Sequence, residues 1–114
     1  MNPASDRRVV ITGMGIVCPV GLSIDEAWGN ILAGNSGIRP ITAFDVSDFS
    51  VRFGGTIENF EVTDYVSKKD ARKMDTFIHY GVAAGAQAKE KEKQEQKEKE
   101  RTNRKKNQKN KKER

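Results

Sequence analysis

Two side chains of this sequence are candidates for nucleophilic chemistry, and each is the only one of its type. Cys18 is the single cysteine and His79 the single histidine among 114 residues. A cysteine activated by a histidine is a common arrangement for acyl transfer, but the two groups must lie within hydrogen-bond reach. No basic residue flanks Cys18 in the sequence to favour its thiolate. We therefore interpret Cys18 as a small structural side chain and His79 as a helix residue with a packing or solvent role, and assign no catalytic residue.

Gly13 and Gly15 follow an apolar run and could be part of a phosphate-binding loop. Such a loop leads directly into the N-terminus of a helix, whose free N–H groups hold the phosphate. Here Cys18 occupies the position of the third glycine, and the next helix is expected only after Ser23. We interpret the two glycines as a sharp turn and expect no cofactor. A single cysteine also falls short of a disulfide or a zinc site, so we expect no metal.

Three cationic side chains form the remaining candidate site: Lys69, Arg72 and Lys73. Their helical spacing places them on one basic face. Such a face is most often simply solvated, because charged residues cover the exposed side of ordinary helices. The alternative is a docking surface for an acidic partner, where positive charge speeds encounter and fixes orientation.

The composition divides the chain into two parts. Residues 89–114 contain 13 Lys or Arg, 6 Asp or Glu and no hydrophobic residue, which gives a net charge of +7. Residues 1–88 hold every hydrophobic residue, with 8 Lys or Arg and 10 Asp or Glu, a net charge of −2. We expect a folding unit at 1–88 and a low-complexity tail at 89–114. No apolar run reaches the roughly 20 residues of a membrane span and no secretory signal is present, so a cytoplasmic location is expected.

The folding unit is expected to begin with a strand and a helix. The β-branched run at residues 9–12 is apolar without alternation, which is typical of a strand covered on both faces. Ser23 and Glu26 fit a capping box that opens a helix, and Gly34 is well placed to end it. The helix would bury a face made of four apolar residues: Ala27, Trp28, Ile31 and Leu32.

A loop, a second strand and a second helix are expected to follow. Residues 35–50 have the composition of a loop, and residues 51–57 that of a strand weakened by two glycines. Ser67 and Asp70 form a cap pair for the second helix. Its predicted buried face recurs at intervals of three and four residues: Met74, Phe77, Ile78, Gly81, Val82 and Gly85. The glycines on that face and the alanines beside it predict the close approach of another backbone.

The order strand, helix, loop, strand, helix indicates an incomplete α/β fold. A strand covered on both faces needs neighbours that this order does not supply, so we expect a chain that is marginally stable, prone to self-association or partly molten. In the tail, i,i+4 pairs such as Glu95–Lys99 would lengthen the preceding helix. From Thr102 onward the composition predicts disorder, because there is nothing to bury. The tail is thus expected to be helical or disordered.

The residues of the folding unit resemble a known family. The match begins with RRVVITGMGIVCPVG at residues 7–21 and extends to about Ala88. It is similar to the opening of the bacterial β-ketoacyl-[acyl-carrier-protein] synthases that elongate fatty acids. The further matching segments are AW at 27–28, LAG at 32–34, SGI at 36–38, FD at 44–45, DYVSKK at 64–69 and RKMDTFI at 72–78.

This resemblance implies the N-terminal portion of a thiolase-like α/β fold, usually a homodimer, in an acyltransferase that performs a decarboxylative Claisen condensation. In that family a cysteine carries the acyl chain and two histidines assist malonyl-carrier protein, and all three lie downstream of the matched region. The resemblance therefore predicts a truncated synthase that is inactive alone. It also implies that Lys69, Arg72 and Lys73, with Lys68 nearby, contact the acidic acyl carrier protein. The alternatives are a non-enzymatic carrier-docking module and a fragment of a polyketide ketosynthase.

The tail allows two further interpretations. Its main residue types can be written with adenine-rich codons, so an altered reading frame after Ala88 would produce this composition. A nucleic-acid-binding arm would suit the charge of +7. However, the tail has no aromatic residue to stack on bases, which argues against such an arm. No membrane partner is expected.

Overall fold

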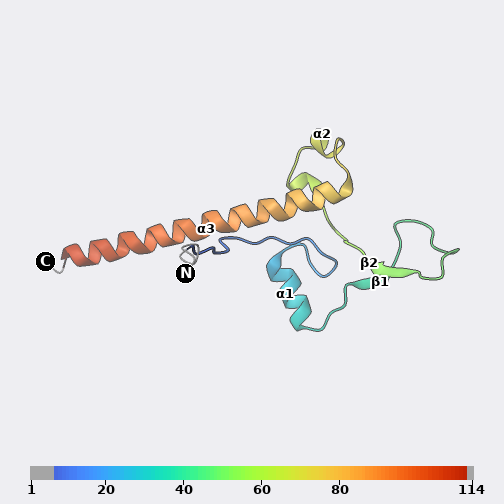
Figure 1. The fold of residues 1–114 in the computed structure, drawn as a ribbon, viewed down its shortest axis with the longest axis horizontal. Coiled ribbons are helices and arrows are strands. Elements are labelled where there is room, and N and C mark those ends of the chain that lie inside the picture. Colours follow the sequence, from blue (N-terminus) through green and yellow to red (C-terminus); the bar gives the residue numbers. More distant parts are fainter. Residues whose placement is uncertain (1–6, 113–114) are drawn as a thin grey trace, which may run out of the picture.

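The fold is that of a computed structural model, which describes residues 7–112. The ends of both predicted parts, residues 1–6 and 113–114, lie outside the described residues. In chain order the elements are helix α1 (Ile24–Leu32), strands β1 (Ile38–Pro40) and β2 (Phe53–Gly55), the 3-10 helix η2 (Val62–Asp64), and helices α2 (Lys68–Ala71) and α3 (Thr76–Lys112). Helix α3 forms the long axis of the molecule, and the other elements lie toward its N-terminal end (Figure 1).

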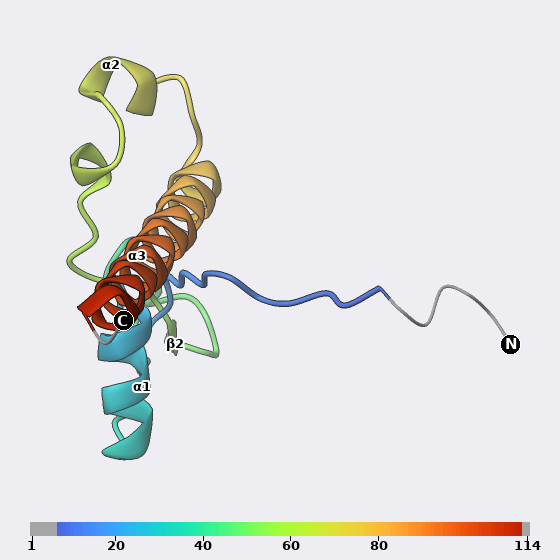
Figure 2. The ribbon, with the colours of Figure 1, turned by 90° about the vertical axis from the view of Figure 1, so that its left-hand side faces the viewer.

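The N-terminal segment forms no strand, so the predicted strand at residues 9–12 is wrong. Val9 is 94% exposed and Ile11 is 80% exposed. The start of the segment projects away from α3 (Figure 2). A strand needs a neighbour to pair its N–H and C=O groups, and none of the described residues supplies one here. The run has the composition of a covered strand but is left uncovered.

Helix α1 begins and ends where the sequence predicts. Ser23 Oγ accepts a hydrogen bond from the Glu26 N–H at 3.3 Å. The Glu26 carboxylate in turn accepts from the Leu22 N–H at 3.2 Å, one residue before the partner that a capping box uses. At the other end Gly34 has a φ of 74°, and its N–H donates to the Ile31 carbonyl at 3.1 Å. Glycine adopts this left-handed conformation without strain, so the helix stops there.

The predicted buried face of α1 is largely wrong. Ala27 is buried, because the turn at Gly21 lies directly against its backbone. Trp28, Ile31 and Leu32 are all more than half exposed. The amphipathic pattern is present in the sequence, but residues 7–112 provide no element that covers the rest of this face.

The sheet consists of two short antiparallel strands, with Arg39 opposite Gly54. Strand β2 lies inside the predicted strand at 51–57, which confirms that element in a shorter form. Strand β1 lies inside the predicted loop at 35–50, so the loop prediction is wrong there. Turn-forming residues such as Pro40 favoured a loop, whereas β1 forms because it pairs with β2, which lies further along the chain.

The second predicted helix is divided in two. Helix α2 starts as predicted, because Ser67 Oγ accepts a hydrogen bond from the Asp70 N–H at 3.1 Å. It lasts for 4 residues, and residues 72–75 then form a turn. The Asp75 carboxylate accepts from the Thr76 N–H at 2.6 Å. A carboxylate at this position satisfies a free N–H of a new helix, so α3 starts there rather than continuing from α2.

The face of α3 that packs against other elements is not the predicted one. On the predicted face Phe77 is 70% exposed, and a Cβ added at Gly81 would meet no atom within 4 Å. On the other side Ala83 is fully buried. We call the first set the open face, made of Phe77, Ile78, Gly81, Val82 and Gly85. We call the second set the packed face, made of Tyr80, Ala83, Ala84 and Gln87.

The N-terminal segment crosses α3 where both backbones carry small residues. A Cβ at Gly15 would overlap the carbonyl oxygen of Ala84, and a Cβ at Gly13 would overlap that of Ala88. The predicted close approach of a second backbone is therefore present. It occurs at the alanines of α3, against glycines of the N-terminal segment, rather than at the glycines of α3.

The tail is helical as far as Lys112, so the predicted disorder from Thr102 onward is wrong. The predicted Glu95–Lys99 contact is present, with Nζ and Oε2 separated by 3.5 Å. Lys, Glu, Gln and Arg are good helix formers. Because extending an existing helix avoids the cost of nucleation, α3 continues through the tail without any apolar burial.

The described chain has little core. Ala27 and Ala83 are the buried hydrophobic residues among those described. The accessible surface is 10061 Å², whereas a compact monomer of this mass exposes about 6,200 Å². The radius of gyration is 21.3 Å, against about 13 Å for a compact domain of this length. The structure is a partial α/β arrangement that leaves most of its large apolar side chains open.

Candidate functional site

The side chain of Gln87 joins three segments at the packed face of α3. Its Oε1 accepts a hydrogen bond from the Ile16 N–H at 3.1 Å. Its Nε2 donates to the Leu22 carbonyl at 2.6 Å and to the Tyr65 hydroxyl at 3.1 Å. Sequence reasoning did not single out Gln87. The sequence feature that could have identified it is its position as the one amide side chain among the alanines and glycines at the start of α3.

Three aromatic rings fix η2 against α3. The rings of Phe60 and Tyr65 stack with centroids 6.0 Å apart. Phe60 also meets Tyr80 of the packed face edge-on, with centroids 5.1 Å apart. Such pairs contribute about 0.5–1.5 kcal/mol beyond the area that they bury. Because η2 leads into α2, this cluster determines where α2 stands.

The predicted basic site lies on α2 and the turn after it. Lys68 and Lys69 are on the helix, Arg72 and Lys73 begin the turn, and all four side chains are exposed. We call these four residues the α2 basic surface. Helix α2 stands at the edge of the molecule, away from the sheet (Figure 1). The ion pairs of residues 7–112 join other side chains, so no described carboxylate pairs with this surface.

Two carboxylates border the α2 basic surface, and each is engaged locally. Asp70 accepts a hydrogen bond from the Ser67 hydroxyl at 2.8 Å. The hydroxyl of Thr63, which donates to Glu61 at 2.7 Å, lowers the pKa of Glu61, and the Thr63 N–H and the charge of Lys68 act in the same direction. Both carboxylates are held by caps at the starts of helices. The cations beside them remain available to an acidic partner.

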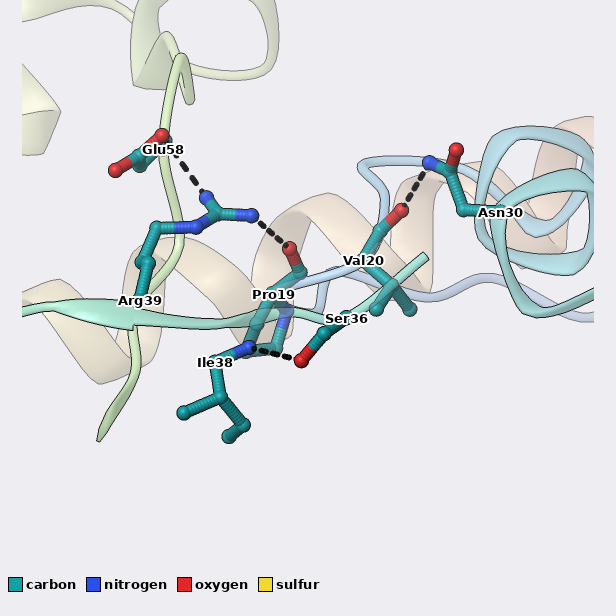
Figure 3. Close-up of polar contacts among 7 residues, drawn as sticks. All are labelled: Pro19, Val20, Asn30, Ser36, Ile38, Arg39 and Glu58. Carbon is teal, nitrogen blue, oxygen red and sulfur yellow. Dashed lines mark hydrogen bonds and ion pairs between the residues drawn. The ribbon is translucent and has the colours of Figure 1, made fainter. Parts of the chain in front are cut away.

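A polar cleft of about 240 Å³ lies between α1 and β1. Arg39 crosses it, donating to the Pro19 carbonyl at 3.1 Å and pairing with Glu58 at 2.9 Å (Figure 3). Asn30 of α1 donates to the Val20 carbonyl at 2.6 Å. Because Arg39 and Glu58 pair with each other and the Glu26 carboxylate accepts from the Leu22 N–H, the cleft is a structural junction that holds the turn at Pro19 and Val20. Nothing in the sequence pattern identified Arg39 in this role.

Cys18 and His79 take part in separate local contacts. The Cys18 thiol donates to the Gly21 carbonyl at 3.5 Å, and Nε2 of His79 donates to the Ala71 carbonyl at 2.9 Å. These contacts fit the structural roles that the sequence predicts for both residues. Among the described hydrogen bonds none joins the two side chains, so residues 7–112 hold no thiol–imidazole pair.

Across residues 7–112, no group of three or more His, Cys, Asp or Glu side chains is placed to hold a metal ion. None of the helices in the same range combines the length and apolar content needed to cross a membrane.

Comparison with known proteins identifies relatives of the N-terminal part of the chain and a family model that extends into the tail. A family model described as "Beta-ketoacyl synthase, N-terminal domain" matches residues 6–105. The 3-oxoacyl-[acyl-carrier-protein] synthase 2 of Vibrio harveyi is 55% identical over 83 residues, which cover 73% of this chain and 20% of that protein. The protein of the same name from Synechocystis sp. is 43% identical over 81 residues, covering 71% of this chain and 20% of its own length.

A solved structure, "The ishigamide ketosynthase/chain length factor", is also similar. It superposes with a TM-score of 0.66 and 34% identity, covering 75% of this chain and 21% of that chain. The chain thus spans about a fifth of the length of the relatives that it matches.

Proposed function

The chain belongs to the β-ketoacyl synthase family, and from this membership we propose that it works as part of a 3-oxoacyl-[acyl-carrier-protein] synthase of fatty acid biosynthesis. The observation that carries the proposal is the 55% identity over 83 residues to a synthase of that name. The family and the ketosynthase-like α/β fold predicted from the sequence are both confirmed. The proposed reaction joins an acyl thioester to malonyl-carrier protein with loss of carbon dioxide. The location that we propose, a reducing cytoplasm, suits the free thiol of Cys18.

We propose further that this chain alone does not condense acyl groups. Condensation through a thioester needs a nucleophile with a base beside it and donors aimed at the developing oxyanion. The described thiol and imidazole are instead held by separate backbone carbonyls. The role supported for residues 7–88 is therefore structural support and recognition, with the chemistry supplied by residues outside the matched region.

A condensation assay tests this proposal. The purified chain is incubated with acyl- and malonyl-carrier protein, and release of carbon dioxide is compared with a blank without protein and with a complete synthase. We expect no release above the blank. Turnover that disappears in a C18S variant would overturn the proposal and make Cys18 the nucleophile.

The α2 basic surface is the proposed contact for the acidic carrier protein. Its four cations are exposed and not ion-paired with any described carboxylate. Charge at such a surface acts mainly on the rate of encounter and on orientation. The support is the match of these residues to the family together with their exposure at the edge of the molecule.

Charge reversal tests this contact. The variant K69E/R72E/K73E is compared with K89E/K93E/K97E, which reverses three exposed lysines of α3 and changes the net charge by the same amount. We expect the first variant to weaken binding of carrier protein about tenfold or more, and the second to change it less than about threefold. If both variants lost the same affinity for carrier protein, the interaction would depend only on net charge, and the α2 basic surface would not be the contact.

A polyketide ketosynthase is the second candidate, and one observation bears on it. The structural relative is a ketosynthase/chain length factor with 34% identity, below the 55% of the fatty acid synthase relative. The comparison favours the fatty acid type.

A further inference from the structure

The positive charge of the tail is concentrated in its second half. Residues 89–100 contain 5 lysines and 5 glutamates, so their net charge is zero. Residues 101–112 contain 7 Lys or Arg and no Asp or Glu. The charge of the tail therefore belongs almost entirely to the last three turns of α3, which are regular helix.

Helical geometry gathers these cations on one side. Arg101, Lys105 and Lys109 follow one another at i,i+4, and Arg104 and Lys111 flank that row. At 3.6 residues per turn, the five positions fall within an arc of about 160°. All five side chains are exposed, and none belongs to an ion pair of residues 7–112. We call these five residues the distal basic face.

The chemistry of the helix decides what kind of partner this face fits. A helix that lies in a membrane surface needs an apolar face, and the tail contains no hydrophobic residue. A stable protein interface needs a buried core with aromatic or aliphatic anchors, which the tail also lacks, so a protein partner would be limited to transient docking by charge. Binding to phosphates requires neither, since it depends on charge and on release of counterions.

We propose that the distal basic face binds double-stranded DNA, with the helix lying along the major groove and its cations against the phosphates. The major groove of B-DNA is about 12 Å wide and admits an α-helix. The same groove of an RNA duplex is too deep and narrow for side chains to read. Single strands are bound largely by stacking on aromatic rings, so the absence of aromatic residues counts against single strands and not against a duplex.

The repulsion within the free helix supports this assignment. Arg101 with Lys105, and Lys105 with Lys109, are like-charge pairs at i,i+4, which destabilise a helix. Phosphates placed along the row remove that repulsion. Binding should therefore stabilise the last turns of the helix, and added DNA should slow the hydrogen exchange of their backbone amides.

The test is fluorescence anisotropy of the full chain with a labelled 24-base-pair DNA duplex at several salt concentrations. Five phosphate contacts give a slope of log affinity against log salt of about −4.5, or a loss of about 500-fold between 50 and 200 mM salt. The variant K105Q/K109Q removes two contacts, which should reduce the slope to about −2.7 and the loss to about 40-fold.

The control variant is K89Q/K99Q, which removes two exposed lysines of the same helix whose angular positions lie outside the arc of the distal basic face. It should leave the slope within about 0.5 of that of the parent chain. Equal effects of the two variants would overturn the proposal, and so would equal affinity for an RNA duplex or for a single strand of the same length. Binding of DNA without slower hydrogen exchange of the amides in the last turns would also overturn the proposed mode.

Discussion

The two faces of α3 treat small residues in opposite ways. On the packed face Ala83 is fully buried, and the backbone of Ala84 lies so close to Gly15 that the crossing leaves no space for another atom. On the open face Gly81 and Gly85 have no neighbour within 4 Å, and the large ring of Phe77 lies in solvent. Apolar periodicity alone favours the open face. The comparison shows that the face of α3 that packs against the rest of this chain is the one where a second backbone fits closely.

The largest effect is expected where the packed face meets the N-terminal segment. In Gly15→Ala the new Cβ would overlap the Ala84 carbonyl, and backbone cannot move aside as a flexible side chain can. We expect the segment to detach, at a cost of about 3 kcal/mol. Hydrogen exchange of the Ile16 amide, which is bonded to Gln87, reports this directly. Unchanged protection of that amide would show that the crossing is looser than the structure has it.

A smaller loss is expected from Gln87→Ala on the same face. The substitution removes the partner of the Ile16 N–H, the Leu22 carbonyl and the Tyr65 hydroxyl. Part-buried polar groups left without partners cost about 2 kcal/mol in total, because solvent reaches some of them. Urea unfolding followed by circular dichroism measures the change. Gln96→Ala is the matched control, since Gln96 is exposed on the same helix; an equal loss there would remove the junction role of Gln87.

The open face should respond with the opposite sign. Gly81→Ala places a methyl group in open space and replaces a poor helix former with the best one. We expect α3 to gain about 1 kcal/mol, seen as slower hydrogen exchange in the turns around residue 81. Destabilisation by this variant would mean that a second backbone covers the open face in solution.

The smallest change in stability is expected for Phe77→Gln. A ring that is 70% exposed contributes little to the fold, so the free energy of unfolding should stay within about 0.5 kcal/mol. Self-association, however, should weaken, because exposed apolar rings of this size drive it. Sedimentation velocity measures the second effect, with Phe77→Leu as the variant that keeps the apolar surface. A loss of stability comparable to that of Gln87→Ala would place Phe77 in a core.

The elements that the sequence predicts correctly are those set by neighbours in the chain. The caps at Ser23 and Ser67 and the stop at Gly34 depend on residues within one turn, and all three are present. Strand β1 depends on a distant segment and was missed. The run at residues 9–12 has strand composition, but no described strand pairs with it. Local signals therefore fix these three helix ends, whereas the break at residues 72–75 and the strand pairing were not predicted.

The candidate site divides in the same manner. The structure exposes Lys69, Arg72 and Lys73, but of these three only Lys69 lies on α2, and the other two begin the turn after it. Their contact with carrier protein stays a prediction. The roles of Gln87 and Arg39 could not be predicted from the sequence, because an amide or a guanidinium can reach many backbone carbonyls. Which carbonyl each one meets depends on the path of segments that lie far away in the sequence.

The unbroken course of α3 has a mechanical consequence. Its 37 residues rise by about 54 Å from first to last. The helix therefore holds the distal basic face at a fixed distance and a fixed rotation relative to the packed face. Inserting one residue near its middle would rotate the distal basic face by about 100° about the helix axis. Inserting seven residues would restore the original orientation to within about 20° and move that face about 10 Å further along the axis.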